Sequence, residues 1–413
     1  MTKTLLGVIL TASVDIGGNA PIALPPIRWP EYLRMRVMTV QWLAVVALFG
    51  ISIGCASSTE KDRPTDTSYF QSTAKPIGML LEPEPAAEIG YRLGWASPVQ
   101  LLEGQAITSV TALDDIVIVV EDPKNIVTAL STRDGKLLWK VNIGSDIESI
   151  FPPSRDEDQI FIHSASRFWT LKARTGDVTA VAPLQSPVSS KAVYSPEQRL
   201  AIMSGTDGLV FAHSVDSNFS RWAYRMANRL TEPCVLTGQD VFIADSGGTY
   251  AMLEVGNGSP LWRNRTLGPV STTPAVQGSE VIVASEDGKL YALNRTTGRD
   301  TWKYLGAEQE LTASPIALGR LIIQPLVPNP GIIAIDAING TEIWRTDVTA
   351  TPVLTRQQDM LLYTSNKLVT IDLDDGSVEK QVPIKTVQTV LPVGDGGVLL
   401  VSPSGRLLKL SPQ

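Results

Sequence analysis

Beyond residue 88 the chain alternates between short apolar runs and small clusters of turn-forming residues. The stretch 270–305 shows the pattern most clearly, with apolar or alternating runs at 270–276, 280–284, 289–293 and 300–305. The residues between these runs are Gln-Gly-Ser, Glu-Asp-Gly and Arg-Thr-Thr-Gly. Runs of about five residues bounded by such clusters predict β-strands joined by hairpins. Since this stretch has no sustained helical period, it predicts four antiparallel strands.

This four-strand unit recurs along the chain. The segment "ALNRTTGRDTW" (292–302) places a glycine four residues before a tryptophan, and related segments place the same turn position at 135, 176, 218, 258, 298, 340 and 376. Asn218 replaces the glycine in one copy. A fixed period of ~40 residues with four strands in each unit is typical of a β-propeller blade.

The number of blades follows from the hairpins between the second and third strands. These hairpins lie near residues 122, 164, 207, 246, 287, 329, 365 and 403, which predicts eight blades. The chain ends at Gln413, where the outer strand of the eighth unit should begin, and a missing strand would leave an open edge. The segment Tyr91 to Ser97 carries Trp95 and is expected to supply it. The predicted fold is therefore all-β: an eight-bladed propeller of four-stranded antiparallel blades over residues 89–413, closed by an N-terminal strand.

The recurring tryptophans have an expected structural role on the outer strands. Each indole would cover the flank of the adjacent blade, and each buried tryptophan removes roughly 200 Å² from water. Ala292, in the middle of the preceding strand, would leave room for a large ring from a neighbouring element. The residues assigned to this blade docking are Trp95, Trp139, Trp222, Trp262, Trp302 and Trp344. Two units lack the tryptophan and carry Ala180 and Lys380 instead.

The N-terminal region has the order of a secretion signal. Arg34 and Arg36 precede an uncharged stretch (37–54) that ends in small residues before Cys55. This resembles a bacterial lipoprotein signal over residues 35–54, in which Cys55 would carry the lipid, although Ser52 stands where leucine is usual. The alternative is an uncleaved signal anchor. Residues 1–34 fit poorly ahead of such a signal, which favours Met35 or Met38 as the true start.

Residues 55–88 are rich in Ser, Thr, Pro and charged residues and are expected to form a flexible tether after the lipidated cysteine. The predicted location is the periplasmic side of the bacterial cell envelope, with the lipid in the outer membrane. The net charge of −7 argues against a nucleic-acid partner, for which a basic face is expected.

A search for reactive groups finds no catalytic residue, metal ligand set or cofactor motif. His163 and His213 fall in or beside predicted strands and are expected to be core residues, as is Cys234. The sequence "DLDDG" (372–376) superficially resembles a calcium loop, but its spacing is wrong and it occupies a hairpin position. We therefore expect a non-catalytic protein without a bound cofactor.

The pattern A-x-[DN]-x-x-x-G-x-x-x-W resembles the tryptophan-docking repeats of the quinoprotein, or pyrroloquinoline quinone (PQQ), family over nearly all of residues 89–413. Two branches of that family matter: the PQQ-dependent dehydrogenases and the BamB-like lipoproteins of the outer-membrane β-barrel assembly (BAM) machinery. The dehydrogenases cover the quinone with a disulfide of adjacent cysteines and bind it through calcium. This chain has no adjacent cysteines and no large insertions. The resemblance thus implies a monomeric, membrane-tethered scaffold that binds envelope proteins, among them the BAM complex. The alternative is a quinoprotein-type dehydrogenase or a propeller that binds a small ligand in its central channel.

The resemblance also indicates where partners would bind. In the family, partner-binding loops join the outer strand of one blade to the inner strand of the next. The most distinctive such loop here is 224–233, which offers Arg225, Arg229 and Leu230. The alternative for this loop is a solvated connector.

Overall fold

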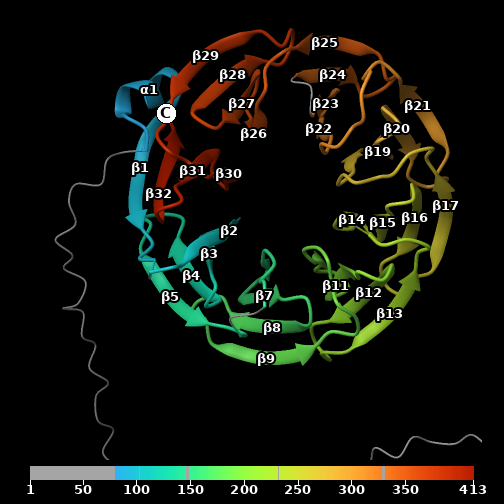
Figure 1. The fold of residues 1–413 in the computed structure, drawn as a ribbon, viewed down its shortest axis with the longest axis horizontal. Helices are drawn as coiled ribbons and strands as arrows, with labels where there is room; N and C mark the ends of the chain where they lie inside the picture. Colours follow the sequence, from blue (N-terminus) through green and yellow to red (C-terminus); the bar gives the residue numbers. More distant parts are fainter. Residues whose placement is uncertain (1–79, 102, 146–147, 231, 328–330) are drawn as a thin grey trace, which may run out of the picture. The chain divides into compact units, whose positions relative to one another are not determined.

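Eight four-stranded antiparallel sheets are arranged in a ring around a central axis (Figure 1). The structure is a computed structural model that describes residues 80–101, 103–145, 148–230, 232–327 and 331–413. The eight-bladed propeller predicted from the repeats is confirmed. The expected signal peptide, Cys55 and the tether as far as residue 79 lie outside the described residues.

The first four blades of the ring follow one another along the chain. Blade 1 contains β2 (Ala106–Leu113), β3 (Ile116–Asp122), β4 (Ile126–Ser131) and β5 (Leu137–Asn142). Blade 2 contains β6 (Ser154–Asp156), β7 (Gln159–His163), β8 (Arg167–Lys172) and β9 (Val178–Pro183). Blade 3 contains β10 (Val193–Ser195), β11 (Leu200–Ser204), β12 (Leu209–Ser214) and β13 (Ser220–Arg225). Blade 4 contains β14 (Val235–Thr237), β15 (Asp240–Ala244), β16 (Thr249–Glu254) and β17 (Pro260–Arg265).

The remaining blades continue in the same order. Blade 5 contains β18 (Ala275–Gln277), β19 (Glu280–Ser285), β20 (Lys289–Asn294) and β21 (Asp300–Tyr304). Blade 6 contains β22 (Ile316–Leu318), β23 (Leu321–Pro325), β24 (Ile332–Asp336) and β25 (Glu342–Thr346). Blade 7 contains β26 (Thr351–Thr355), β27 (Asp359–Thr364), β28 (Lys367–Asp372) and β29 (Val378–Pro383). Blade 8 combines β30 (Thr389–Val393), β31 (Gly397–Val401) and β32 (Arg406–Pro412) with β1 (Tyr91–Pro98).

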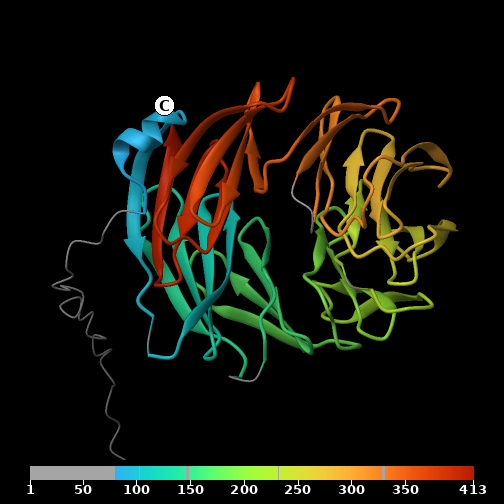
Figure 2. The same ribbon diagram turned by 45° about the horizontal axis from the view of Figure 1, so that its top comes forward.

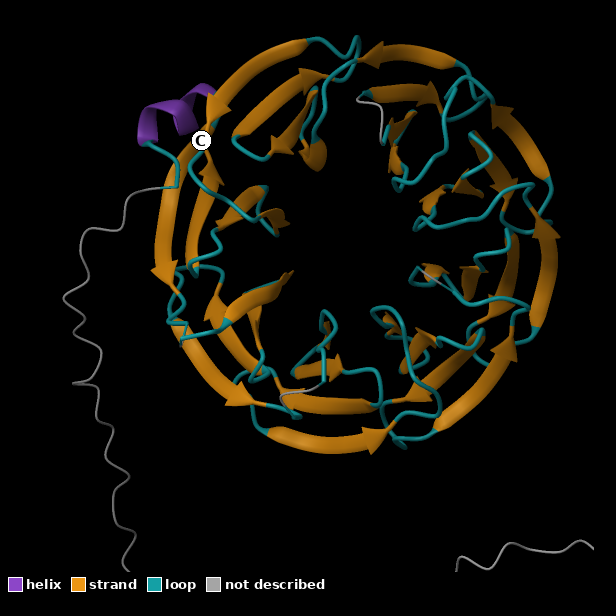
Figure 3. Ribbon diagram, viewed as in Figure 1, coloured by secondary structure: helices purple, strands orange, loops and turns teal. Residues whose placement is uncertain are grey.

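Within blades 1 to 7 the order along the chain is also the order from the channel to the rim (Figure 3). The two middle strands are buried on both faces because each blade packs between two others. In blade 5, for example, residues 281–285 of β19 and 290–293 of β20 are all buried. Strands covered on both sides read as continuous apolar runs rather than alternating ones, which explains the sequence pattern.

The ring closes where the two ends of the propeller meet. β1 pairs antiparallel with β32, from Tyr91 opposite Pro412 to Pro98 opposite Arg406, with a bulge between Leu93 and Ala96. The first strand of the propeller thus supplies the outer strand of blade 8, as the sequence predicts.

Residues just before β1 also belong to the folded part, which corrects the expected tether boundary at residue 88. Helix α1 (Pro83–Glu88) lies beside the C-terminus at the closing blade (Figure 2). Leu80, Leu81 and Ala86 are at most 5% exposed and pack against apolar residues of blades 7 and 8. The backbone N–H of Lys385 donates to the Leu80 carbonyl at 2.8 Å. The sequence suggested a tether because this segment is rich in Pro and Glu, but its few apolar side chains are enough to hold it.

Six indoles contact the next blade in one repeated arrangement. The Trp302 Nε1–H donates to the Ala337 carbonyl at 3.0 Å, and its ring lies on the turn glycine of the next blade, Gly340. A Cβ atom at Gly340 would stand 2.5 Å from Cε3 of the indole, so only glycine fits beneath the ring. The same arrangement joins Trp95 to Gly135, Trp139 to Gly176, Trp222 to Gly258, Trp262 to Gly298 and Trp344 to Gly376. Ala292 of β20 lies opposite Trp302 of the neighbouring strand β21, so its small side chain leaves room for that indole, as the sequence predicts.

The two junctions without a tryptophan are filled in other ways. Ala180 of blade 2 carries no indole, and the matching turn of blade 3 carries Asn218 in place of glycine, with φ of 57°. Buried phenylalanines fill this junction: Phe161, Phe168 and Phe211. At the junction after Lys380, the segment with Leu80, Leu81 and α1 completes the core.

Candidate partner-binding face

One face of the ring carries the loops that join each outer strand to the next blade, and we call it the loop face. The turns between the second and third strands lie on the same face, because the two kinds of connection are hydrogen-bonded to each other. The Met226 N–H donates to the Gly208 carbonyl at 2.9 Å, and the Thr266 N–H donates to the Gly248 carbonyl at 2.9 Å. Each loop is therefore held by the turn of its own blade.

The loop after β13 is fixed by its apolar side chains and its backbone. Met226, Leu230 and Cys234 are buried in the core between blades 3 and 4. The Ser189 hydroxyl donates to the Leu230 carbonyl at 3.0 Å, and the Ser246 N–H donates to the Arg229 carbonyl at 3.0 Å. The backbone position of this loop is thus set by both neighbouring blades.

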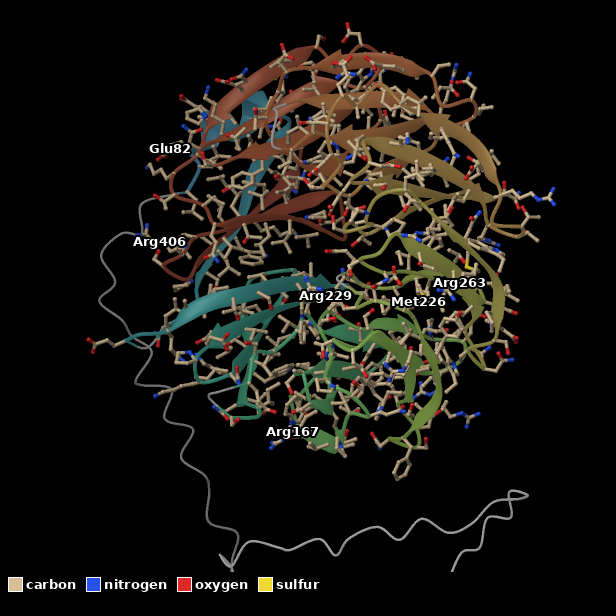
Figure 4. All side chains as sticks on the ribbon, turned by 45° about the vertical axis from the view of Figure 1, so that its right-hand side comes forward. Glu82, Arg167, Met226, Arg229, Arg263 and Arg406 are labelled. Atoms are coloured by element: carbon tan, nitrogen blue, oxygen red, sulfur yellow. The ribbon has the colours of Figure 1, made fainter. Side chains whose placement is uncertain are left out.

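The structure separates the three residues that the sequence proposed for partner binding. Arg225 and Arg229 are exposed on the loop face, and Figure 4 shows Arg229 close to Met226 in this loop. Arg225 donates to the Asp207 carbonyl at 2.8 Å and to its carboxylate at 3.1 Å. Leu230 is only 1% exposed, so its assignment as a contact residue is corrected: it anchors the loop, because an apolar side chain here enters the core.

The Asp207 carboxylate that pairs with Arg225 is itself held by the turn. The Leu209 backbone N–H donates to it at 3.1 Å, and this bond, together with Arg225, holds the pKa of Asp207 below its usual range. The carboxylate remains charged and keeps the guanidinium in place at the surface.

Three exposed apolar residues on the loop face were missed by sequence reasoning. Leu267 follows β17, Leu305 follows β21 and Val327 lies between β23 and β24; they are 84%, 64% and 50% exposed. Leu267 and Leu305 each precede a glycine within two residues of the end of an outer strand. This repeated Leu-Gly pair was the signal that could have revealed the two leucines, since a connector needs no apolar residue there.

An acidic recess of 340 Å³ lies next to this apolar group. Leu305 forms part of its lining together with four carboxylates: Glu286, Asp287, Glu308 and Glu310. The loop face therefore presents two arginines at blade 3, then exposed leucines, then an acidic recess at blade 5. Such a mixture of apolar and charged groups is suited to binding another protein rather than to chemistry on a small molecule.

The central channel has a different character. A cavity of 990 Å³ is lined mainly by small, apolar and proline residues of the first strands, with Arg155 and Lys191 as its charged residues. Arg155 is paired with Asp115 and donates to the Leu113 carbonyl at 3.1 Å. In the part of the chain that the structure describes, no group of three His, Cys, Asp or Glu side chains is placed to share a metal ion.

Both histidines are buried at the junction between blades 2 and 3. The Ala192 N–H donates to Nε2 of His163 at 2.9 Å, so Nδ1 carries the proton and faces the Ser164 carbonyl at 3.0 Å. His213 packs against Phe168 with ring centroids 4.7 Å apart. Burial lowers the pKa of each histidine to about 4, which keeps both rings neutral at physiological pH. They are core residues, as the sequence predicts.

Cys234 is also a core residue. Its thiol is buried against the Ser204 hydroxyl at 3.4 Å, and burial raises its pKa to about 11. Since a reactive cysteine needs a lowered pKa, this thiol is inert.

Comparison with known proteins assigns the family. A family model described as outer membrane protein assembly factor BamB matches residues 92–228 and 206–413. The chain belongs to the BamB family. BamB of Moranella endobia (strain PCIT) is 23% identical over 333 residues, which cover 76% of each chain. BamB of Nitrosomonas eutropha (strain DSM 101675 / C91 / Nm57) is 29% identical over 126 residues, which cover 30% of each chain.

One relative from outside this group carries an enzyme name. The tetrathionate hydrolase of Acidithiobacillus ferrooxidans is 26% identical over 194 residues, covering 47% of this chain and 36% of the hydrolase.

Solved structures support the fold. The crystal structure of BamB from Moraxella catarrhalis superimposes with a TM-score of 0.61 at 18% identity, covering 76% of this chain and 99% of that one. The C-terminal WD40 domain of Sif2 gives a TM-score of 0.61 at 8% identity. The propeller is thus shared with proteins of unrelated sequence, and the BamB assignment rests on the family match. Among the described residues, no helix has the length and hydropathy to cross a membrane.

Proposed function

We propose that this protein is a non-catalytic scaffold of the bacterial envelope that binds protein partners through its loop face during outer-membrane protein assembly. The observation that carries the proposal is the loop after β13, in which hydrogen bonds hold the backbone at Met226 and Arg229 while Arg225 and Arg229 are exposed on the same face of the ring as Leu267 and Leu305. A rigid surface with exposed apolar and arginine side chains loses little entropy on binding. The BamB relatives support assembly of outer-membrane proteins as the process and the BAM complex as the partner.

We also propose that a lipid on Cys55 holds the propeller at the periplasmic side of the outer membrane. The support is the order of positive charges, apolar stretch and small residues before that cysteine. The segment between Cys55 and Leu80 would allow the ring to stand away from the membrane surface. The family itself is an outer-membrane assembly family, which fits this location.

The experiment that tests partner binding is affinity purification of detergent-extracted membranes with the tagged full chain. The variant Arg229→Glu/Leu267→Asp reverses the charge at position 229 and places a negative charge at position 267, among the exposed apolar residues of the loop face. Leu261→Asp is the matched control. Leu261 is 51% exposed on β17, the strand that Leu267 follows, but it lies on the rim and not on the loop face. We expect the control to recover the same membrane proteins as the wild type and the double variant to lose them. Equal recovery by all three proteins would show that partners do not bind this face.

The non-catalytic part of the proposal has its own test. The channel lining offers few convergent polar groups, so the protein should not bind pyrroloquinoline quinone in the presence of calcium. Isothermal titration calorimetry with the full chain measures this directly. Stoichiometric uptake of the quinone, or quinone-dependent alcohol oxidation, would favour the dehydrogenase alternative instead.

A further inference from the structure

The outer strand of blade 2 differs from every other outer strand of the ring. β9 has the sequence VTAVAP and carries no charged residue, whereas each of the other seven outer strands carries at least one. In the described part of the chain β9 is the last strand of its sheet, so one of its edges is unpaired. An unpaired edge presents backbone N–H and C=O groups that another strand can use, and proteins usually protect it with charged side chains. β9 lacks that protection.

The comparison with β29 shows that the difference is specific. β9 and β29 are the two outer strands without a docking tryptophan, and both begin with valine and end with proline. β29 carries Glu379, Lys380 and Gln381, and all three are exposed. The corresponding residues of β9 are Thr, Ala and Val. The missing tryptophan therefore does not explain the absence of charge on β9.

Exposed apolar side chains lie on β9 and also in a turn of the next blade. Val178 and Val181 are 41% and 54% exposed, and Phe219 in the turn before β13 is 75% exposed. Figure 1 shows β13 following β9 along the rim of the ring. The residue that follows the turn glycine is polar in the six other turns of this kind: Lys136, Asp177, Ser259, Arg299, Thr341 and Ser377. Phe219 is the exception, and it stands next to the blade that has the uncharged edge.

We propose that β9 is a docking edge for an extended, uncharged segment of another polypeptide, rich in β-branched or aromatic residues. The segment would add to blade 2 as a fifth strand through backbone hydrogen bonds, and its side chains would cover Val181 and Phe219. Strand addition of this kind combines main-chain hydrogen bonds with contacts to alternate side chains. The docking edge lies on the rim, so this inference is independent of partner binding at the loop face.

A second copy of this chain is a poorer occupant. Two convex rims would meet along a single six-residue strand, a contact of about 20 Å in length. Such a contact is one strand wide, whereas a stable interface between two proteins spreads over ~1,200 Å² or more. A single extended segment is flexible enough to follow the rim from β9 to Phe219.

The test uses the full chain and a defined probe. The probe is an eight-residue peptide of alternating valine and threonine, with a fluorophore and a short ethylene glycol tail for solubility, and binding is measured by fluorescence anisotropy. The variant Thr179→Glu/Val181→Gln gives β9 the residues that β29 carries at the same positions. We expect it to bind the peptide at least about tenfold more weakly than the wild type, with an unchanged melting temperature. Leu138→Glu on β5 is the matched control and should bind as the wild type does, because that residue is 44% exposed on another rim strand.

Two further measurements separate strand addition from general stickiness. A peptide with alternate backbone amides methylated keeps its side chains but cannot pair along one edge, and it should not bind. The proposal is overturned if the wild type does not bind the peptide, if Thr179→Glu/Val181→Gln binds it equally well, or if the methylated peptide binds as tightly. It is also overturned if sedimentation shows that the chain dimerises through β9. The variant Arg229→Glu/Leu267→Asp should leave peptide binding unchanged. If this variant lost peptide binding, the peptide site would lie on the loop face and not on β9.

Discussion

Trp95 lies on the backbone of Gly135 so closely that a Cβ atom at Gly135 would stand 2.4 Å from Cε3 of the indole. The Trp95 Nε1–H also donates to the Thr132 carbonyl at 2.8 Å, and this carbonyl accepts a second bond from the buried ammonium of Lys409 at 3.1 Å. The contact joins the first strand of the propeller and the last strand to blade 1. It is the point at which the ring is closed.

Removing this indole should open the closing junction. We expect Trp95→Ala to lower the free energy of unfolding by about 2 kcal/mol, less than for a fully buried tryptophan because Trp95 is partly exposed. Urea denaturation followed by circular dichroism measures the change. Trp302→Ala is the control, because it removes the equivalent indole at a junction that does not join the two ends of the chain. An unchanged midpoint for Trp95→Ala would mean that β1 does not close the ring.

The turn glycines should be required for space as well as for their backbone conformation. Asparagine tolerates positive φ, as Asn218 shows, but a side chain at Gly298 would stand 2.4 Å from the Trp262 ring. We therefore expect Gly298→Asn to destabilise the protein by about 3 kcal/mol, while Asn218→Gly changes stability by less than about 1 kcal/mol. The double variant Gly298→Asn/Trp262→Ala should be more stable than the two single effects predict, which a double-mutant cycle measures. If the free-energy changes of the two single variants simply add in the double variant, the Trp262 indole is not the reason why glycine is required at position 298.

Truncation should locate the true start of the folded part. Deleting residues 1–79 should leave the melting temperature almost unchanged, and extending the deletion through residue 88 should lower it by several degrees. The reason is that the longer deletion removes Leu81 and Ala86 from the core of blades 7 and 8. Burying a leucine contributes about 2 kcal/mol. Equal melting temperatures for the two truncations would show that α1 contributes nothing to stability.

Stability should fall in mild acid because of the two buried histidines. Their pKa is about 4 in the folded protein and 6.5 without burial, so between these values the unfolded chain binds more protons than the folded one. The stabilisation is complete above pH 6.5 and is lost as the pH falls towards 4, at a cost of up to about 3 kcal/mol for each histidine. Urea midpoints between pH 7.5 and 4.5 measure the slope. The variant His163→Gln/His213→Phe should flatten it, and a slope that persists in this variant would assign the acid sensitivity to other groups.

Cys55 should carry the lipid that tethers the protein. Metabolic labelling with a radioactive fatty acid should mark the wild-type chain and not Cys55→Ala, and the variant should leave the membrane fraction. Cys234→Ala is the control, because that thiol is buried and unreactive. Label that survives Cys55→Ala would place the lipid on another residue, and a wild-type chain that stays in the membrane fraction without label would favour the uncleaved signal anchor.

Much of the fold could be predicted because each blade is specified locally. Strands and hairpins are determined within about 40 residues by short apolar runs and by a turn position such as the one before Trp302. The repeat of this unit along the chain then gives the number of blades. The closure through Trp95 followed from the same logic, since an unpaired eighth blade needed a strand. The candidate binding face was predicted less well. Arg225 and Arg229 were placed correctly on the surface, but Leu230 was not, because the hydropathy of a single loop residue does not tell whether it points into the core.

By itself, the sequence determined the strands and the turns of each blade, because these depend on residues close together in the chain. The tertiary structure decided the relationships between distant segments. It placed Leu80 and Leu81 on residues of blades 7 and 8 some 300 positions away, where the docking tryptophan is absent. It also made β9 and β13 neighbours on the rim, so that the uncharged strand stands next to the blade that carries Phe219. Burial and exposure are properties of the assembled ring, so which side chains remain free to meet a partner emerges only when every blade has its neighbours.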